Sequence, residues 1–230
     1  MRVSQRMTPN PITVSLTTTH RDAADLMRRH HIRRLPVVDH ERRLLGIVTQ
    51  TDILNTSPSP ATTLSIYEIY TLLDQLKVEQ FMTSPAFAVD EDCAIADAAQ
   101  FMIQNTIGAL PVVKDDRIVG IITETDIFRT FVEILGGGEV GASFDVRAEH
   151  KKGTLAAVAK ATADAGGNIV SLTTFHAADP EHAVISVKER GADVPLLKRA
   201  LESIDHIEIL EFSETSGSRL LTIGKTASMA

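Results

Sequence analysis

Hydrophobic and polar positions follow the same order twice along the first 135 residues. The apolar run LPVV occurs at 35–38 and again at 110–113, and each copy is followed by a polar segment and a second apolar run containing GI(V/I)T. Two short apolar runs around a few polar residues are typical of a β-hairpin. The copies are 75 residues apart at LPVV and 74 at GI(V/I)T. The missing residue therefore falls in the turn, where loops tolerate length changes.

Helical spacing of apolar residues flanks each predicted hairpin. It covers 19–32 and 91–105 before the hairpins, and further helices are expected after GI(V/I)T, from 51 and from 125. Thr19 and Asp22, three residues apart, form a possible capping box, and Asp90 is expected to cap the helix of the second repeat. With opening strands near 12–14 and 86–89, each repeat is predicted as strand, helix, strand, strand, helix.

A different order of elements follows the glycine-rich segment 136–141. Strands are expected at 143–149, 168–177, 182–189 and 206–212, with helices at 154–167 and 194–204. This βαββαβ order is that of the ferredoxin-like plan. A loop and a helix at 64–78 separate the two repeats, and the polar tail after Ser213 is expected to be mobile. The fold class is therefore α+β, with a repeated module and a separate C-terminal domain.

Composition excludes several classes of function. Aromatic residues make up 4% of the chain and Trp is absent, which argues against a surface for stacking nucleic-acid bases. The net charge of −7 disfavours broad binding to nucleic acid or to anionic membranes. The N-terminus lacks the apolar segment of a signal peptide, and no apolar run approaches the ~20 residues needed to span a bilayer. We expect a cytoplasmic protein that contacts neither nucleic acid nor membrane.

Candidate chemistry is sparse outside the repeats. None of the eight histidines falls in a metal-binding motif, so no metal is expected. The single cysteine, Cys93, cannot form an internal disulfide and is expected to be a packing residue. The sequence contains neither a P-loop nor a GxSxG motif. We therefore predict no catalytic residues and no required cofactor.

The repeated phrase has two interpretations. GIVTQTDIL at 46–54 returns as GIITETDIF at 120–128, with six of nine positions identical. In the structural interpretation the glycine closes a turn, and Thr49 with Asp52, like Thr123 with Asp126, only caps a helix. In the functional interpretation these side chains bind a ligand. The two are compatible because a carboxylate has two oxygens.

The complete pattern of LPVV, hairpin and GI(V/I)TxTD resembles the CBS domain family, from Val3 to Leu135. The resemblance implies a pair of modules with two clefts between them, in which Thr49, Asp52, Thr123 and Asp126 hold adenosine-type ligands. One carboxylate can accept hydrogen bonds from both ribose hydroxyls, and a helix N-terminus favours phosphate. An apolar slot for adenine is expected from Ile12, Leu35 and Pro36 in the first repeat and from Phe87, Leu110 and Pro111 in the second.

Arg33 and Arg34 precede the first LPVV, where many nucleotide-binding CBS modules are basic. We expect them to bind phosphate. The second repeat has Gly108 and Ala109 instead, so the two clefts are expected to differ. The alternative is that the arginines belong to a solvated helix end and stabilise its dipole.

The C-terminal domain resembles the ACT domain family through Gly153, Leu155, Gly167, Asn168 and Ile169, although His150 and Lys152 replace an aspartate and a proline of the usual pattern. The resemblance implies dimerisation and an amino-acid site. The expected site residues are Lys152, Gly153, Thr154, Leu155, Asn168 and Ile169. The alternative is a domain that only dimerises.

A CBS pair followed by an ACT domain resembles the acetoin utilization protein B family. We expect domains at 1–57 and 78–135, an inter-module linker and helix at 58–77, an ACT domain at 142–213 and a tail at 214–230. The predicted function is a non-catalytic, homo-oligomeric sensor of an adenine nucleotide that controls a protein partner, with a link to acetoin or acetate metabolism. The alternatives are a ligand-independent oligomerising adaptor and an enzyme with an unrecognised site.

Overall fold

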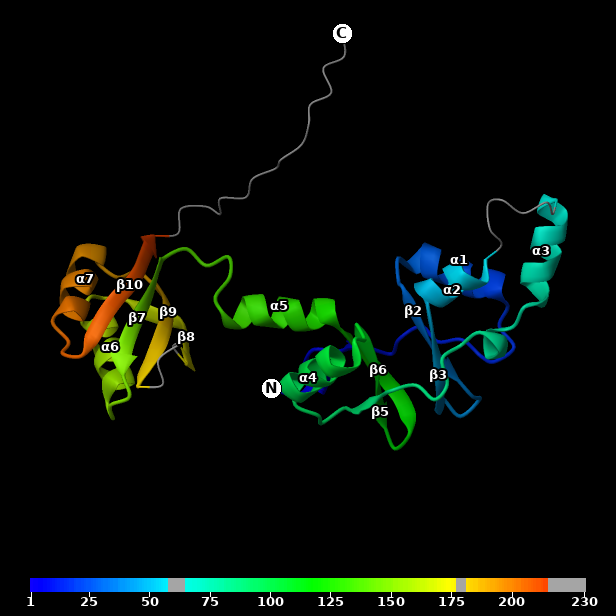
Figure 1. Ribbon diagram of the computed structural model, residues 1–230, viewed down its shortest axis with the longest axis horizontal. Helices are drawn as coiled ribbons and strands as arrows, with labels where there is room; N and C mark the ends of the chain where they lie inside the picture. Colours follow the sequence, from blue (N-terminus) through cyan, green and yellow to red (C-terminus); the bar gives the residue numbers. More distant parts are fainter. Residues whose placement is uncertain (58–64, 177–180, 215–230) are drawn as a thin grey trace, which may run out of the picture. The chain divides into compact units, whose positions relative to one another are not determined.

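The computed structural model describes residues 1–57, 65–176 and 181–214 (Figure 1). Contacts divide the chain into two compact units, Met1–Thr130 and Phe131–Ala230. The predicted tail, apart from its first residue, and most of the predicted linker before the inter-module helix lie outside the described residues.

The first unit contains both predicted hairpins. In the first repeat, β2 (Arg34–Val38) pairs antiparallel with β3 (Leu44–Thr49), between α1 (His20–His30) and α2 (Gln50–Thr56). In the second repeat, β5 (Ala109–Lys114) pairs antiparallel with β6 (Arg117–Thr123), between α4 (Ile95–Asn105) and α5 (Glu124–Ile134). The order of helix, hairpin and helix is confirmed in both repeats.

The two helices before the hairpins begin differently. Thr19 caps α1 as predicted, because its hydroxyl oxygen accepts a hydrogen bond from the backbone N of Asp22 at 3.0 Å. The predicted cap of α4 is wrong. Ala94 is the N-cap residue of α4, and Asp90 lies in β4 (Val89–Asp90), which pairs parallel with β5. The Asp90 carboxylate instead accepts from the backbone N of Asp92 at 2.8 Å, so it closes a turn before the helix.

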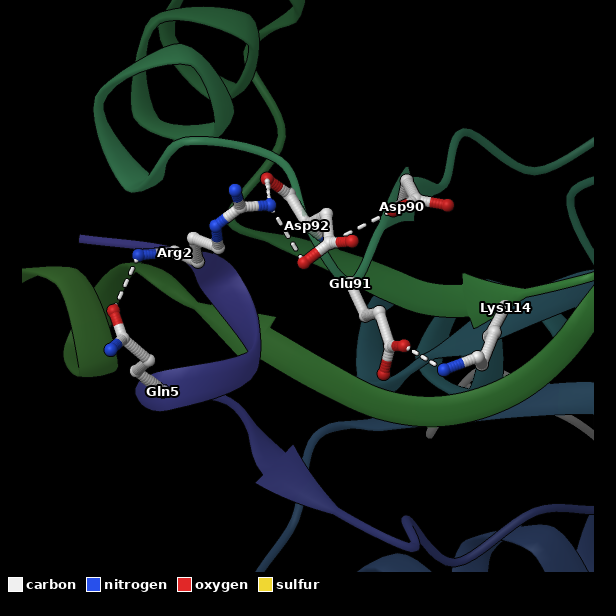
Figure 2. Close-up of polar contacts among 6 residues, drawn as sticks. All are labelled: Arg2, Gln5, Asp90, Glu91, Asp92 and Lys114. Atoms are coloured by element: carbon white, nitrogen blue, oxygen red, sulfur yellow. Dashed lines mark hydrogen bonds and ion pairs between the residues drawn. The ribbon is translucent and has the colours of Figure 1, made fainter.

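The leading segment of the first repeat packs on the second module. β1 (Thr8–Pro9) pairs antiparallel with β6, with Thr8 opposite Ile121. Val3, in the 3₁₀ turn η1 (Val3–Gln5), is fully buried in the core of the second module. Figure 2 shows Arg2 reaching Asp92 in an ion pair of 2.7 Å, beside the pair formed by Glu91 and Lys114. The first residues of the chain therefore complete the second module.

The leading segment of the second repeat packs on the first module in the same way. Val78, in the 3₁₀ turn η2 (Val78–Gln80), is fully buried in the core of the first module. Thr83 and Ile47 exchange backbone hydrogen bonds of 2.9 and 3.0 Å. Each module thus takes its opening segment from the other repeat. The predicted strand near 12–14 is reduced to one parallel bridge, Val14 with Val37.

The glycine of each repeated phrase lies inside a strand and does not close a turn. Gly46 pairs with Val37, and Gly120 pairs with Val112 on one side and Pro9 on the other. The pairing register shifts between Val37 and Val38 in β2 and between Val112 and Val113 in β5. The glycines therefore serve the packing of the strands.

The helix predicted between the repeats is α3 (Ile66–Gln75). Ser65 begins it with a capping box: the backbone N of Ser65 donates to the Glu68 carboxylate at 2.8 Å. It contacts α1, where Arg21 and Asp74 form an ion pair of 3.3 Å. Among the described residues, no helix is both long enough and apolar enough to cross a membrane.

The second unit has the predicted βαββαβ order. Its strands are β7 (Ala142–Glu149), β8 (Asn168–His176), β9 (His182–Arg190) and β10 (Ile207–Glu214), in the sheet order β10-β7-β9-β8. The helices α6 (Thr154–Asp164) and α7 (Val194–Glu202) lie along the same face of the sheet (Figure 1). The core there joins Phe144 and Val146 of the sheet with Val158 and Leu197 of the helices.

Candidate functional site

The repeated phrase begins α2 and α5 with the same capping geometry. The hydroxyl oxygen of Thr49 accepts from the backbone N of Asp52 at 3.3 Å, and Oδ2 of Asp52 accepts from the backbone N of Thr49 at 2.8 Å. Thr123 and Asp126 repeat this pattern at 3.3 and 2.9 Å. The helix-capping part of the structural interpretation is therefore present in both copies. Because these bonds involve Oδ2, Oδ1 of each aspartate lies outside the capping box.

A first cavity of about 360 Å³ opens beside the start of α2. Thr49, Gln50 and Thr51 border it from the repeated phrase, and Arg33 and Arg34 border it from the segment before LPVV. The remaining walls come mainly from the second repeat. They are Ile47, Thr83, Ala86, Phe87 and the segment 106–109.

A second cavity of about 230 Å³ lies at the equivalent place beside α5. Several of its walls are equivalent to those of the first cavity: Thr123 replaces Thr49, and Glu124 replaces Gln50. The second cavity has no described wall equivalent to Ala86 or Phe87. Asp126 also borders the second cavity, whereas Asp52 is not among the lining residues of the first within the described chain. The other walls are Thr8, Ile121, Thr125, Gly108 and the segment 31–34. The two phrases therefore mark two related but unequal cavities.

Arg33 and Arg34 border both cavities. The helix-end alternative does not fit, because α1 ends at His30 and Arg34 is the first residue of β2. Burial is the main reason that the pKa of Arg34 is lowered, and the charge of Arg33 adds to this effect. An arginine remains charged at neutral pH regardless. One pair of cations is thus shared by two cavities.

Gly108 makes room for the shared arginine. A Cβ atom on Gly108 would collide with Nη2 of Arg34 and would stand 2.6 Å from Oε2 of Glu124. The second repeat has Gly108 where the first repeat has Arg33. The missing side chain therefore leaves space that Nη2 of Arg34 and Oε2 of Glu124 both border.

The structure places the residues expected to form an adenine slot in different surroundings. Phe87 borders the first cavity, is 55% exposed, and packs edge-on against Phe101 with ring centroids 5.2 Å apart. Phe87, which belongs to the second repeat, therefore borders the same cavity as Thr49 of the first repeat. Leu35 and Leu110 are fully buried in the two module cores, because alternate strand residues face opposite sides. The described residues that border the two cavities do not include Ile12, Pro36 or Pro111 either.

Several wall residues were not predicted. Ile47 and Ile121 lie two residues before the capping threonines and face the cavities. Thr8 and Thr83 belong to the duplicated Met-Thr pair, whose 75-residue spacing is a signal that could have identified them. Gln50 and Glu124 occupy the one position of GI(V/I)TxTD that varies in charge.

The C-terminal unit has a cavity of about 350 Å³ beside the start of α6. Lys152, Thr154 and Leu155 border it, and Gly153 lies between them as the N-cap residue of α6. Asn168 and Ile169 begin β8, after the opposite end of the 11-residue helix, and are not among its described walls. Half of the expected amino-acid site is therefore brought together.

The charges around this cavity are partly paired. Lys151 lies 2.9 Å from Glu149, and this contact is the main cause that lowers the pKa of the Glu149 carboxyl. Lys152 makes no ion pair with any described residue. The cavity thus has one cation available for an acidic group.

Other candidate chemistry is weak. Within the parts of the chain that the structure describes, no group of three or more His, Cys, Asp or Glu side chains is placed to hold a metal ion. Burial, followed by the charge of Asp97, raises the pKa of the Cys93 thiol. Cys93 packs against the core of the second module, so it is not an activated nucleophile.

Comparisons with known proteins agree with this architecture. The family model described as CBS domain matches residues 3–59 and 78–133. A solved Vibrio cholerae protein assigned to acetoin utilization is 32% identical, with 59% of this chain and 93% of that chain covered and a TM-score of 0.50. The protein CBSX2, solved in complex with AMP, is 26% identical, with coverages of 58% and 97% and a TM-score of 0.50.

Among curated proteins, an uncharacterised protein of Methanocaldococcus jannaschii is 34% identical over 143 residues, which is 60% of this chain. The match spans only 34% of the length of that relative. The family model covers both repeats and their hairpins. The chain therefore belongs to the CBS domain family and contains a tandem pair of CBS domains.

Proposed function

We propose that this protein is a non-catalytic regulatory sensor whose CBS pair binds an adenosine-containing ligand of the AMP, ADP or ATP class. CBS domain pairs are regulatory modules, and the AMP complex of CBSX2 shows that a similar pair can hold an adenine nucleotide. The observation that carries the proposal is the pair of related cavities. Each one is bordered by Arg33, Arg34 and a capping threonine.

The walls of the first cavity match the parts of a nucleotide. Two guanidinium groups suit a phosphate, because arginine forms paired, charge-assisted hydrogen bonds. Ile47, Ala86 and Phe87 supply an apolar surface for adenine. The volume of about 360 Å³ falls within the range of roughly 300–1,000 Å³ that is typical of ligand pockets.

Ribose is assigned to the aspartates of the repeated phrase. Oδ2 of Asp52 and of Asp126 belongs to the capping box, which leaves Oδ1 of each carboxylate to accept from ribose hydroxyls. Oδ1 of Asp126 also lies 3.6 Å from Nη1 of Arg129. Asp126 has 12% of its side chain exposed and borders the second cavity. Because α2 has only seven residues, its N-terminus adds little, and the arginines are the main phosphate ligands of the first cavity.

Calorimetry with AMP and adenosine tests this function. Replacing both Arg33 and Arg34 with Gln should weaken AMP binding by about 10- to 150-fold for each lost contact, since hydrogen bonds to charged groups are worth roughly 1.5–3 kcal/mol. Adenosine binding should change little. Arg29→Gln is the control, because it removes an exposed charge that borders neither cavity. Failure of the wild-type protein to bind either compound at millimolar concentration would contradict the proposal.

Regulation requires that the ligand stabilise one state more than another. A ligand at 100 times its Kd should stabilise the protein by about 2.7 kcal/mol, which a thermal shift detects. A ligand-independent adaptor would show no shift. We place the regulated partner in acetoin or acetate metabolism, and the support is the likeness to the Vibrio cholerae protein.

We further propose that the C-terminal unit is an ACT-like domain that joins subunits and binds a small amino acid. The support is the cavity of about 350 Å³ at the start of α6 and the charge of Lys152, which forms no ion pair with a described residue. Lys152 could hold a carboxylate together with the amides after Gly153. Lys152→Gln should abolish binding in a calorimetric screen of the common amino acids. Lys160→Gln, on the exposed side of α6, is the control. A wild-type protein that binds none of them would instead support a domain that only dimerises.

A further inference from the structure

We propose that the two cavities of the CBS pair divide their ligands by charge, with Gln50 and Glu124 as the residues that decide. The first cavity takes a phosphate-bearing adenine nucleotide, and the second takes an adenosine derivative without a phosphate. This inference rests on the proposed nucleotide function and specifies the ligand class of each cavity.

Gln50 and Glu124 are equivalent residues in equivalent surroundings. Each follows the capping threonine as the first residue of its helix, and each borders one cavity. The backbone N of Gln50 donates to the carbonyl oxygen of Arg33 at 2.8 Å, and the backbone N of Glu124 donates to that of Gly108 at 3.2 Å. The two side chains therefore start from the same place in each module and differ only in charge.

The charge of the cavities differs as a result. The first cavity has two cations, Arg33 and Arg34, and its described walls contain no carboxylate. The second cavity has the same two cations together with Glu124 and Asp126. Counting the arginine and carboxylate side chains of the walls, the formal charge is +2 in the first cavity and zero in the second. Arg129, which lies 3.6 Å from Oδ1 of Asp126, is not one of the described wall residues. A doubly charged phosphate is therefore attracted to one cavity and faces no net attraction in the other.

Glu124 also competes directly for the shared arginine. Its Oε2 atom and Nη2 of Arg34 both lie against the open side of Gly108, and the carboxylate charge attracts the Arg34 guanidinium. A phosphate in the second cavity would have to displace this carboxylate and would then lie beside a like charge. Juxtaposed like charges are a strong basis for rejecting a ligand.

The sizes of the cavities agree with the same division. The second cavity has a volume of about 230 Å³, against about 360 Å³ for the first. A ligand without a phosphate needs less space. In each cavity, size therefore favours the same ligand that charge favours.

The chain supplies its own matched substitutions for a test. Glu124→Gln gives the second cavity the residue of the first, and Gln50→Glu does the reverse. Glu79→Gln is the control, because it removes an exposed carboxylate that borders neither cavity. The probes are AMP and adenosine, titrated by calorimetry against the full chain.

We expect the wild-type protein and Glu79→Gln to bind one AMP per chain tightly and two molecules of adenosine. Glu124→Gln should bind a second AMP, with affinity increased by about tenfold or more at that cavity. Gln50→Glu should weaken the tight AMP site by a similar factor and leave adenosine unchanged. With AMP saturating the wild-type protein, one adenosine site should remain.

Two equal AMP sites in the wild-type protein, or an unchanged AMP stoichiometry in Glu124→Gln, would overturn the division by charge and leave the nucleotide function standing. Binding of neither AMP nor adenosine would instead remove the nucleotide function itself. If Glu124→Gln fails to fold by circular dichroism, Gln50→Glu decides, since unweakened AMP binding by that variant contradicts the inference.

Discussion

The sulfur atom of Met82 lies 2.9 Å from the point that a Cβ atom on Gly46 would occupy. The carbonyl oxygen of Thr83 lies 2.8 Å from the same point. Gly46 therefore lets the leading segment of the second repeat cross β3 at close range. Met7 crosses Gly120 in the equivalent position of the other module.

Alanine at these glycines should destabilise the two modules unequally. Gly46→Ala meets a backbone oxygen, which cannot move without shifting the strand, so we expect a loss of about 1–3 kcal/mol in the free energy of unfolding. The three atoms nearest to a Cβ atom on Gly120 all belong to the flexible side chain of Met7, so Gly120→Ala should cost less. Urea denaturation followed by far-UV circular dichroism compares the two. An equal or larger loss for Gly120→Ala would contradict this reasoning.

The aspartates of the repeated phrase should affect stability and binding separately. Asp52→Ala and Asp126→Ala each remove a cap and should lower stability by about 1 kcal/mol. If Oδ1 holds ribose, each should also weaken adenosine binding at its cavity by about 10- to 150-fold.

The asparagine variants separate these effects. Asn keeps one oxygen for the cap but replaces the second with an amide NH₂, so stability should recover while binding stays weak. Calorimetry and denaturation on the four variants give the result. Unchanged adenosine binding in both alanine variants would show that the carboxylates are only caps.

Gly153→Ala should destabilise the C-terminal unit through its backbone. Gly153 has φ of +93°, a region that costs other residues roughly 1–2 kcal/mol, while nothing lies within 4 Å of an added Cβ atom. Both tyrosines of the chain lie in α3, so their fluorescence does not report on this unit. Faster hydrogen exchange of the α6 amides is the expected signal. Unchanged exchange would show that the helix start adapts without strain.

We expect the protein to be a homodimer or larger. Phe128, Phe131 and Val132 are 71%, 61% and 56% exposed, and their spacing places them on one face of α5. Large exposed apolar faces usually mark a contact surface. Sedimentation at micromolar concentration should show a mass above 25.0 kDa, and Phe128→Ser with Phe131→Ser should reduce it. Tyr67→Ser, at an 85% exposed site of α3, is the control. A wild-type monomer would refute the prediction.

Local patterns predicted the hairpins and helices because the apolar residues of each element recur at the spacing of that element. They failed at Asp90, since a carboxylate before an apolar run can close a turn as well as cap a helix. They also missed the exchange of leading segments. The apolar character of Val3 and Val78 shows that they are buried, but it does not show in which of two similar cores.

The site followed the same rule. The repeated phrase and LPVV mark the positions of Thr49, Thr123 and the two arginines, which border the cavities. Leu35 and Leu110 are expected in the adenine slot but face the cores. The sequence cannot show this, because a buried strand has no polar alternation that marks which side borders a cavity. Phe87 is expected beside the phrase of the second repeat, but it borders the first cavity, because the leading segments cross between the repeats.

The crossing of Val3 and Val78 has a consequence for the ancestry of the chain. A polypeptide with one repeat would leave its own hydrophobic core open and present its leading segment to another molecule. It could close both cores only as a domain-swapped pair. Joining two such copies end to end would turn that encounter between molecules into an intramolecular one, at an effective concentration that no longer depends on expression level. The covalent duplication would thus have fixed an assembly that a single repeat could reach only by finding a second copy.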